Sequence, residues 1–224
     1  MCILAKASAC SSFNASRKEV IFAFDLDGTL TLQEILPVIG ALAGIEAELA
    51  ALTRQTLTGA IDFAESFRLR FNMLRAIPSN SIATTVSKIP LNQHLLHFIR
   101  THREQCRIVT GNLDNWIHPL VRKFRCQSYC SHSHIGKNGS LELASILDKG
   151  EAIQHIAAGH PEALIVSIGE SMNDLPMFLH SDIRIAYAGV HEPVPELVAV
   201  ADYMIGDGQT LCRILEHFAR SASD

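Results

Sequence analysis

The sequence has no excess of basic residues and no long apolar run. Its 224 residues contain 19 Lys and Arg against 23 Asp and Glu, which gives a formal charge of −4. Without a basic cluster there is no surface for nucleic acid, so a small molecule is the kind of partner that we expect. No stretch approaches the roughly 18 uninterrupted apolar residues of a membrane-spanning helix, so we expect no membrane partner.

The cysteines lack the spacing of a disulfide framework. They are Cys2, Cys10, Cys106, Cys126, Cys130 and Cys212. In a chain of this size, scattered cysteines are interpreted most simply as reduced thiols, which predicts a cytoplasmic protein. A zinc site formed by Cys126, Cys130, His132 and His134 is the less favoured interpretation of that region.

Residues 1–18 are rich in Ser and Ala, and their apolar run is too short for the core of a signal peptide. We expect them to form a poorly ordered leader. The whole chain is 48% hydrophobic and 19% charged, and its length suits one moderate domain with a small insertion. The sequence does not separate a monomer from a homodimer.

An apolar run at residues 20–24 is followed directly by Asp25, Leu26, Asp27 and Gly28. The run predicts a strand buried on both faces. In an extended chain Asp25 and Asp27 project to the same side, where they repel unless a cation or a shared proton offsets them. Gly28 permits a sharp exit from the strand. This arrangement predicts a site for Mg²⁺ and a phosphate at the carboxyl end of a parallel strand.

Residues 33–91 are almost wholly helical in pattern and too long for a simple crossover, so we expect a helical cap inserted after the first strand. Strands and helices then alternate, which demands a parallel sheet with helices on both sides. The predicted fold is α/β, with a Rossmann-like core formed by residues 19–32 and 92–224. Within the core, we expect a helix at residues 112–124 and a hairpin over residues 128–143 around an Asn-Gly turn.

Two later segments carry polar groups at predicted strand ends. Thr110, Gly111 and Asn112 follow a strand, and a hydroxyl before a helix start suits a phosphate oxygen, although a plain helix cap is the alternative. Glu170 and Asp174 straddle a turn into a helix, so both acids point toward one cation.

Lys149 stands at a predicted helix start, where a positive charge is unfavourable and needs compensation from elsewhere in the fold.

The string 24–30 (Phe-Asp-Leu-Asp-Gly-Thr-Leu), with these later residues, resembles the motifs of the haloacid dehalogenase (HAD) superfamily. The resemblance implies that Asp25 is the nucleophile that becomes phosphorylated. It implies that Asp27 protonates the leaving group and later activates water, while Lys149 bridges the nucleophile and the phosphoryl group. The implied phosphate-binding residues are Gly28, Thr29, Thr110, Gly111 and Asn112. The implied metal ligands, for Mg²⁺, are Asp25, Asp27, Glu170 and Asp174, of which Asp174 supports the site through hydrogen bonds or water.

Two residues depart from that family pattern. Glu170 stands where the family usually has Asp, and Gly28 stands where phosphoserine phosphatases more often have Ser. The extra methylene of Glu170 changes its reach by about one C–C bond, and Mg²⁺ demands near-ideal octahedral geometry. A catalytically weak module that binds a phosphorylated ligand is therefore an alternative function.

The predicted cap resembles that of phosphoserine phosphatases over residues 44–70. By this resemblance Glu34 meets a substrate ammonium, Arg70 grips a carboxylate and Phe63 shields the pocket, with Asn173 also contacting substrate. A planar, bidentate cation suits a carboxylate on physical grounds as well. The expected function is Mg²⁺-dependent hydrolysis of phosphoserine or a similar amino-acid phosphate through an aspartyl phosphate. A HAD phosphatase for another small phosphometabolite is the main alternative.

Overall fold

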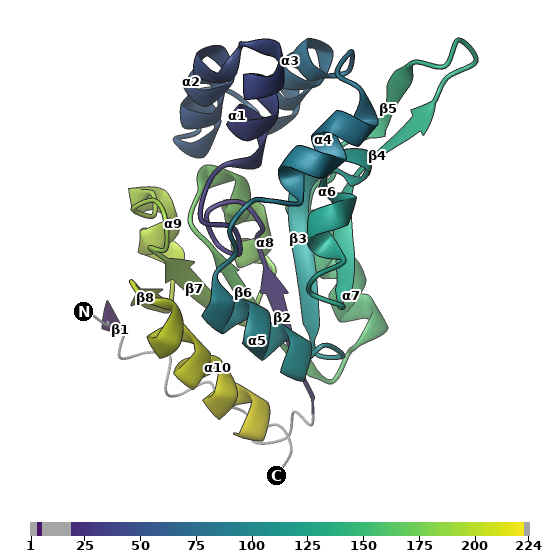
Figure 1. Cartoon of the computed structure of the whole chain (residues 1–224). Helices are drawn as coiled ribbons and strands as arrows, with labels where there is room; N and C mark the ends of the chain where they lie inside the picture. The colour runs from purple at the N-terminus through teal and green to yellow at the C-terminus, as the bar shows by residue number, and fades with distance from the viewer. Residues whose placement is uncertain (1–3, 6–18, 222–224) are drawn as a thin grey trace.

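The computed structural model describes residues 4–5 and 19–221 (Figure 1). The strands are β1 (Leu4–Ala5), β2 (Glu19–Phe24), β3 (Cys106–Leu113), β4 (Gln127–Ile135), β5 (Leu141–Ser145), β6 (Ala163–Gly169), β7 (Ile183–Tyr187) and β8 (Tyr203–Ile205). Across this described part they form one 8-stranded sheet in the order β1-β8-β7-β6-β2-β3-β4-β5. The pairs from β8 to β4 are parallel, which confirms the predicted parallel core.

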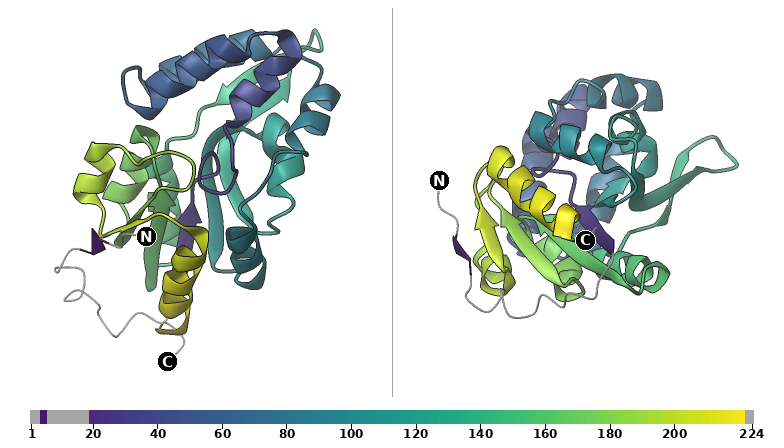
Figure 2. Two further views of the ribbon diagram at one scale, coloured as in Figure 1. Left: turned by 60° about the vertical axis from the view of Figure 1, so that its left-hand side comes forward. Right: turned by 90° about the horizontal axis from the view of Figure 1, so that it is seen from below.

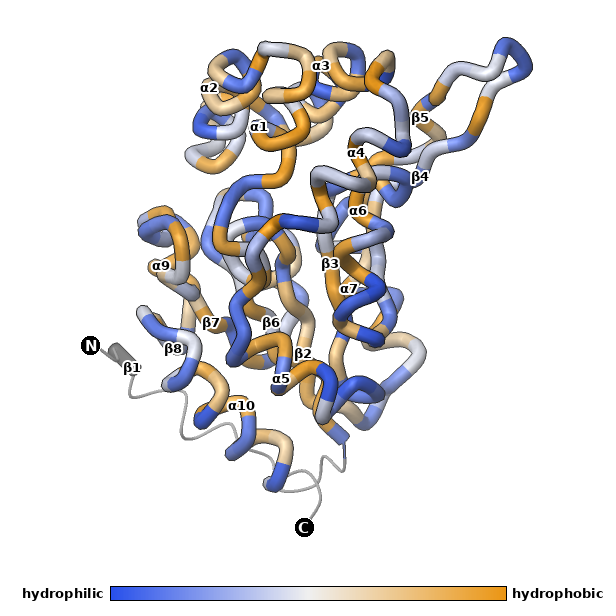
Figure 3. The backbone as a smooth tube through the Cα atoms, in the orientation of Figure 1, coloured by the Kyte–Doolittle hydropathy of each residue, from blue (hydrophilic) through white to orange (hydrophobic). Residues whose placement is uncertain are grey.

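Helices cover both faces of the sheet. The helices that follow the cap are α5 (Gln93–Thr101), α6 (Asp114–Val121), α7 (Lys149–Gly159), α8 (Leu175–Leu179), α9 (Pro195–Val200) and α10 (Gly208–Ser221), with a 3₁₀ turn η3 (Met172–Asp174). Figure 2 shows α5 and α10 on one face of the sheet. In Figure 3, hydrophobic and hydrophilic residues alternate along α10, as expected for a helix that lays one stripe on a core.

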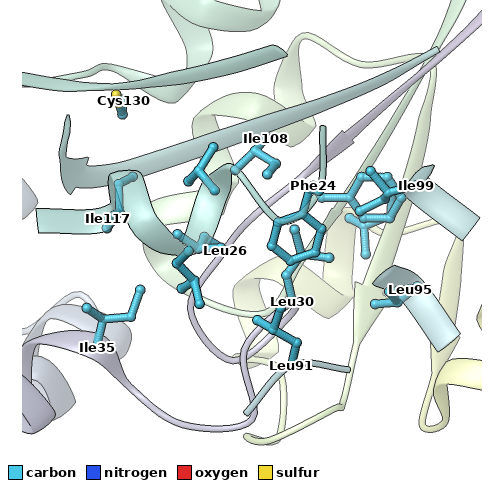
Figure 4. Packing of buried hydrophobic residues seen from close by; sticks show 14 of the residues in the cluster. Phe24, Leu26, Leu30, Ile35, Leu91, Leu95, Ile99, Ile108, Ile117 and Cys130 are labelled. Atoms are coloured by element: carbon cyan, nitrogen blue, oxygen red, sulfur yellow. The ribbon is translucent and has the colours of Figure 1, made fainter. Parts of the chain in front are cut away.

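Strand β2 is central because its side chains fill both hydrophobic layers. Phe22 and Phe24 pack in one cluster with residues of α5, α6 and α10, and Phe22 meets the ring of Phe98 at 5.3 Å between centroids. Ile21 and Ala23 point the other way, into a cluster with α7, α8 and α9. This alternation follows from the two-residue period of a strand. Figure 4 shows the first cluster continuing beyond β2 toward the cap.

The cap comprises α1 (Ile35–Gly40), η2 (Ala41–Ala43), α2 (Glu46–Leu57), α3 (Phe63–Leu74) and α4 (Ser79–Val86). It lies over the carboxyl end of β2 in Figure 1. Asp62 caps α3 by accepting a hydrogen bond from Glu65 N at 3.0 Å. The two chain segments that join the cap to the core run side by side, because Thr31 and Leu91 form an antiparallel bridge.

The predicted helix at residues 112–124 is wrong at both ends. Strand β3 continues to Leu113, and α6 runs only from Asp114 to Val121. The strand persists because its pairing with β4 resumes at Leu113 and Ser131 after a shift in register that begins at Val109. A Thr-Gly-Asn sequence has the composition of a helix cap, but here it forms an irregular end of a strand.

The predicted hairpin is confirmed, with Ile135 opposite Leu141 and Gly139 at a positive φ of 77° in the turn. Of the predicted leader, Leu4 and Ala5 pair antiparallel with β8, and the rest lies outside the described residues. Among the described helices, none has both the length and the apolar character that crossing a bilayer requires.

Candidate active site

The loop after β2 holds Asp25 at the end of the central strand. Asp25 N donates to the carbonyl of Ile168 on β6 at 2.9 Å, so the strand pairing fixes the residue itself. Gly28 adopts a φ of 70°, which favours glycine, and its N–H donates to the hydroxyl of Thr31 at 3.2 Å. The hydroxyl of Thr31 in turn donates to the carbonyl of Leu26. The acidic pair therefore lies on a backbone that is ordered by its own turn.

Lys149, the first residue of α7, provides the compensating charge for Asp25. Its ammonium donates to Asp25 Oδ1 and, at 2.6 Å, to Asp174 Oδ1, and the residue is 2% exposed. Burial alone would lower the pKa of Lys149, but Asp174 and Asp25 outweigh it and raise that pKa. The two carboxylates therefore provide the compensation that the helix start requires.

Asp25 and Asp27 are both harder to ionise than an ordinary aspartate. Burial raises the pKa of Asp25 to about 7, and the charge of Asp174 adds to this against the opposing effect of Lys149. Burial, followed by the charges of Glu34 and Asp25, raises the pKa of Asp27 well above its ordinary value. Acids with raised pKa values in a cleft mark a candidate functional site.

Asp27 is held by the cap and by β3. Its Oδ1 accepts from Ile35 N at 3.1 Å, and its Oδ2 accepts from the side-chain amide of Asn112 at 2.5 Å. The backbone N–H of Asn112 is already bound to the hydroxyl of Thr110 at 3.3 Å. The strand continues through Asn112, and its backbone N–H is used in this local hydrogen bond.

Glu170, which follows β6, is a buried acid whose carboxylate has an ion-pair partner only at 3.9 Å, His191 Nε2, among the described residues. The residue is 2% exposed, and neither carboxylate oxygen has a hydrogen-bond partner in the described part of the chain. Burial raises the pKa of Glu170 to about 10, with further contributions from Asp25, Glu34 and Asp174. An unpaired buried carboxylate is costly, so this position favours a bound cation or proton.

Asp174 has its oxygens occupied by hydrogen bonds. Its Oδ2 accepts from the backbone N–H groups of Glu170 and Ser171, both at 2.9 Å, and from the Ser171 hydroxyl at 3.0 Å. Its Oδ1 accepts from Lys149. This arrangement suits a group that positions Lys149 and the turn, which agrees with the supporting role that the resemblance implies.

The donor set fits a hard divalent cation. Asp25, Asp27 and Glu170 supply carboxylate oxygens, which are the ligands that Mg²⁺ prefers. The unpartnered oxygens of Glu170 are the observation that supports this fit. In the described residues, the possible ligand atoms that lie within 4.8 Å of one another belong to Glu34, Glu170 and His191, and this group does not include Asp25 or Asp27.

Arg70 on α3 brings a buried positive charge from the cap. It is 5% exposed, and its Nε donates to the Ser66 carbonyl at 3.3 Å, while Nη2 has no partner among the described residues. Burial lowers the pKa of Arg70, against the effect of Asp27 and Glu34. The guanidinium lies 5.9 Å from the ring centroid of Phe63. An open donor on a buried guanidinium suits an anionic group of a ligand.

One cavity between cap and core brings most of the predicted residues together. Those that line it are Asp25, Asp27, Glu34, Phe63, Arg70, Thr110, Gly111, Asn112 and Asn173. The other predicted residues are Gly28, Thr29, Lys149, Glu170 and Asp174, which are not part of that lining. Of these, Lys149, Glu170 and Asp174 are linked to the residues that line the cavity through the contacts described above. Thr29 is fully buried, and its hydroxyl has no partner in the described region.

His191, in the loop between β7 and α9, is a residue that sequence reasoning missed. Its Nε2 lies 3.0 Å from Glu34 Oε1 and 3.9 Å from Glu170 Oε1. The hydrogen bond with Glu34 raises the pKa of His191. A single His in a Gly/Pro-containing loop has no spacing that would predict this contact.

Two of the candidate zinc ligands have carboxylate partners. His132 Nδ1 lies 3.1 Å from Asp114, and His134 Nε2 lies 3.2 Å from Glu142. The groups of possible metal ligands found in the described residues do not include Cys126 or Cys130.

The sequence pattern of the haloacid dehalogenase-like hydrolase family matches residues 22–179. The chain belongs to this family. The match begins within β2 and ends with α8, so it spans Asp25, Thr110, Lys149 and Glu170 together with the cap. The HAD resemblance of the sequence motifs is confirmed.

Curated relatives of this HAD hydrolase are phosphoserine phosphatases. The chain is 29% identical over 199 residues to phosphoserine phosphatase SerB2 of Mycobacterium tuberculosis, covering 84% of this chain and 48% of that protein. It therefore spans about half the length of that relative. It is 25% identical over 182 residues to the phosphoserine phosphatase of Methanocaldococcus jannaschii, covering 76% of this chain and 86% of the relative.

Solved structures share the fold of this HAD hydrolase. A substrate-bound phosphoserine phosphatase complex matches with a TM-score of 0.75 and 23% identity, covering 89% of this chain and 98% of the other. A phospho-aspartyl intermediate analogue of phosphoserine phosphatase matches with a TM-score of 0.73 and 23% identity, over 89% of this chain and 99% of that one. The chain is thus a phosphoserine-phosphatase-like hydrolase of the HAD family.

Proposed function

We propose that this HAD hydrolase is a Mg²⁺-dependent phosphomonoesterase that acts on phosphoserine or a similar small amino-acid phosphate. The observation that carries the proposal is one cavity, lined by Asp25 and Asp27 from the core and by Glu34 and Arg70 from the cap. Groups suited to phosphoryl transfer and groups suited to a zwitterion therefore face the same space.

In the proposed reaction Asp25 is the nucleophile. Its carboxylate oxygen forms a bond to phosphorus while the bond from phosphorus to the leaving serine oxygen breaks. Asp27 gives its proton to that oxygen, and burial raises the pKa of Asp27, which favours the protonated form that this step needs. Asp27 then takes a proton from water, which attacks the aspartyl phosphate and releases inorganic phosphate. Asp25 is restored as the carboxylate and Asp27 as the protonated acid, and one difficult displacement becomes two easier ones.

Charge on the phosphoryl oxygens is offset by fixed groups. Lys149 contacts Asp25 directly. The Thr110 hydroxyl oxygen accepts hydrogen bonds from Asn112, so the hydroxyl proton of Thr110 can be donated to a phosphoryl oxygen. Both carboxyl oxygens of Asp27 already accept hydrogen bonds, from Ile35 and Asn112. Asp25 and Glu170 would therefore hold the divalent cation through their carboxylates. That cation supplies a Lewis acid that polarises a phosphoryl oxygen. Preorganised charge of this kind is the main contribution of a protein to phosphoryl transfer.

Recognition of the rest of the substrate falls to the cap. Arg70 offers an unpartnered donor to a carboxylate, and Glu34 offers an acceptor to an ammonium. Phe63 stacks on Phe67 with ring centroids 5.7 Å apart and covers the cavity from the cap side. Four described cysteines are free, which suits activity in the reducing cytoplasm.

The test is Mg²⁺-dependent phosphate release from L-phosphoserine and from two esters that each lack one of its charged groups. L-phosphoserine carries both the carboxylate and the ammonium, phosphoethanolamine lacks the carboxylate, and the phosphate ester of 3-hydroxypropionate lacks the ammonium. We expect L-phosphoserine to be hydrolysed best, Arg70→Ala to remove its advantage over phosphoethanolamine, and Asp25→Asn to abolish turnover of all three. Turnover of another small ester in its place would keep the chemistry and replace the substrate. Turnover by Asp25→Asn would refute the mechanism.

A further inference from the structure

The carboxylate of Glu170 occupies the space that a side chain at position 28 would need. An ideal Cβ built on Gly28 would lie 1.9 Å from Glu170 Oε1, 2.6 Å from Cδ and 2.9 Å from Oε2. All three distances are shorter than non-bonded atoms tolerate in a packed interior. No side chain at position 28 is therefore compatible with Glu170 in its observed place.

The backbone of Glu170 has little freedom to move away. Its N–H donates to Asp174 Oδ2 at 2.9 Å, and its carbonyl accepts from Val194 N at 3.1 Å, so hydrogen bonds fix the backbone on both sides. The residue is almost fully buried, and the nearest ion-pair partner of its carboxylate among the described residues is His191 Nε2, 3.9 Å from Oε1. An added atom at position 28 would consequently displace the carboxylate itself.

We propose that Gly28 is a positioning residue for Glu170: the bare backbone at position 28 makes room for the longer acid beside Asp25 and Asp27. The two departures from the family pattern then compensate each other, because the space left by the absent side chain at Gly28 accommodates the extra methylene of Glu170. The link to cation binding rests on the proposed function, whereas the steric coupling does not.

The coupling predicts non-additive effects of substitutions at the two positions. With Glu170 present, Gly28→Ala should weaken Mg²⁺ binding by roughly tenfold or more, as when a group that orients a metal ligand is lost. In the Glu170→Asp background the acid is one methylene shorter, so the same Gly28→Ala change should weaken binding by no more than about twofold. Calorimetric titration of the full chain with MgCl₂ measures both effects.

A second readout uses metal-free protein and separates steric coupling from backbone strain. Gly28 has a φ of 70°, and any residue with a Cβ is strained there. Gly139 has a similar φ of 77° in the hairpin turn, with no atom within 4 Å of an added Cβ. Gly139→Ala therefore measures the strain alone. Gly28→Ala should lower the melting temperature more than Gly139→Ala does. In the Glu170→Asp background, the decrease caused by Gly28→Ala should become similar to the decrease caused by Gly139→Ala.

Additive effects of Gly28→Ala and Glu170→Asp, in both the titration and the melting temperature, would overturn the proposal. If Gly28→Ala does not fold, recovery of folding by Glu170→Asp supports it. Failure of the double variant as well, while Gly139→Ala folds, refutes it. If the unaltered chain binds no Mg²⁺ but the melting temperatures are coupled, the steric inference stands and the proposed function fails. If the chain is an active phosphatase but the two substitutions act additively, the proposed function stands and the steric inference fails.

Discussion

His191 Nε2 in the core lies 3.0 Å from Glu34 Oε1, at the residue that precedes the first helix of the cap. This contact joins the loop after β7 to the segment that carries the expected ammonium acceptor. Glu34 therefore already has a nitrogen partner, the His191 imidazole, as it would have in a contact with a substrate ammonium. If the proposed function holds, the imidazole and a substrate ammonium compete for the same carboxylate.

The first prediction concerns this competition. His191→Ala leaves Glu34 without its partner, so substrates with an ammonium should gain relative to those without one. We expect the ratio of kcat/KM for L-phosphoserine to that for the phosphate ester of 3-hydroxypropionate to rise by about threefold, a modest change because the pair is partly exposed and screened. His94→Ala, at an exposed position of α5, is the matched control and should leave the ratio unchanged. An unchanged ratio in His191→Ala contradicts the competition.

The second prediction concerns closure of the cap. The ring of Phe63 lies against the bare backbone of Gly111, and an added Cβ would be 2.0 Å from Phe63 Cζ. Gly111→Ala should therefore push the ring and α3 away from the core, lowering kcat/KM by about tenfold, largely through KM. Gly206→Ala is the control, because nothing lies within 4 Å of its added Cβ. Wild-type kinetics in Gly111→Ala would show that Phe63 yields without cost.

The third prediction concerns orientation of Asp27. The side-chain amide of Asn112 is its partner on the core side. Asn112→Ala should lower kcat by about tenfold with little change in KM, because the acid is no longer held toward the leaving group. Asn112→Asp should be worse, since it places a second acid beside Asp27. Phosphate-release kinetics check the order, and equal activity of the two variants argues against the orienting role.

The fourth prediction concerns pH and the hairpin. Burial alone would raise the pKa of Asp114, but hydrogen bonds from Ser133 and His132 outweigh it and hold that pKa below its ordinary value. As pH falls, Asp114 is therefore protonated in the unfolded chain before it is protonated in the folded chain. The ionised Asp114 stabilises the fold above its unfolded pKa, about 3.9, and this stabilisation is lost as pH falls through its pKa in the folded state.

Asp114→Asn should accordingly unfold at lower urea concentration than the unaltered chain at pH 7, and this difference should shrink below about pH 4. Urea titrations at several pH values provide the measurement. Glu162→Gln, at an exposed position outside the hairpin, is the control and should show no such convergence. A difference that stays constant down to pH 3 would show that the Asp114 interaction is not linked to ionisation.

The sequence predicts the parts of the site that depend on a strand ending or on a local charge problem. Asp25 and Asp27 stand out because two acids end a fully apolar run, and Lys149 stands out because its charge is unfavourable where α7 begins. The corresponding contacts are present in the structure. These features are local, so the order of residues alone contains them.

The remaining features depend on tertiary contacts that local pattern does not contain. The local pattern predicts a helix start at Asn112, but pairing between β3 and β4 keeps this residue in a strand, from which its side chain reaches Asp27. His191 and Glu34 are 157 residues apart in the sequence, and a loop residue of this kind has no periodicity. The fit of Glu170 beside Gly28 likewise depends on the distance between the ends of β2 and β6.

The paired linkers of the cap have a consequence for how such proteins diversify. Leu32 N donates to the carbonyl of Pro90 and Asn92 N to that of Leu30, both at 2.9 Å, so the chain leaves the core and returns to it at adjacent points. A recombination event could exchange everything between these points for another insert without moving either end of the break. The substrate preference that we propose for the insert would then be inherited separately from the phosphoryl-transfer chemistry proposed for the core.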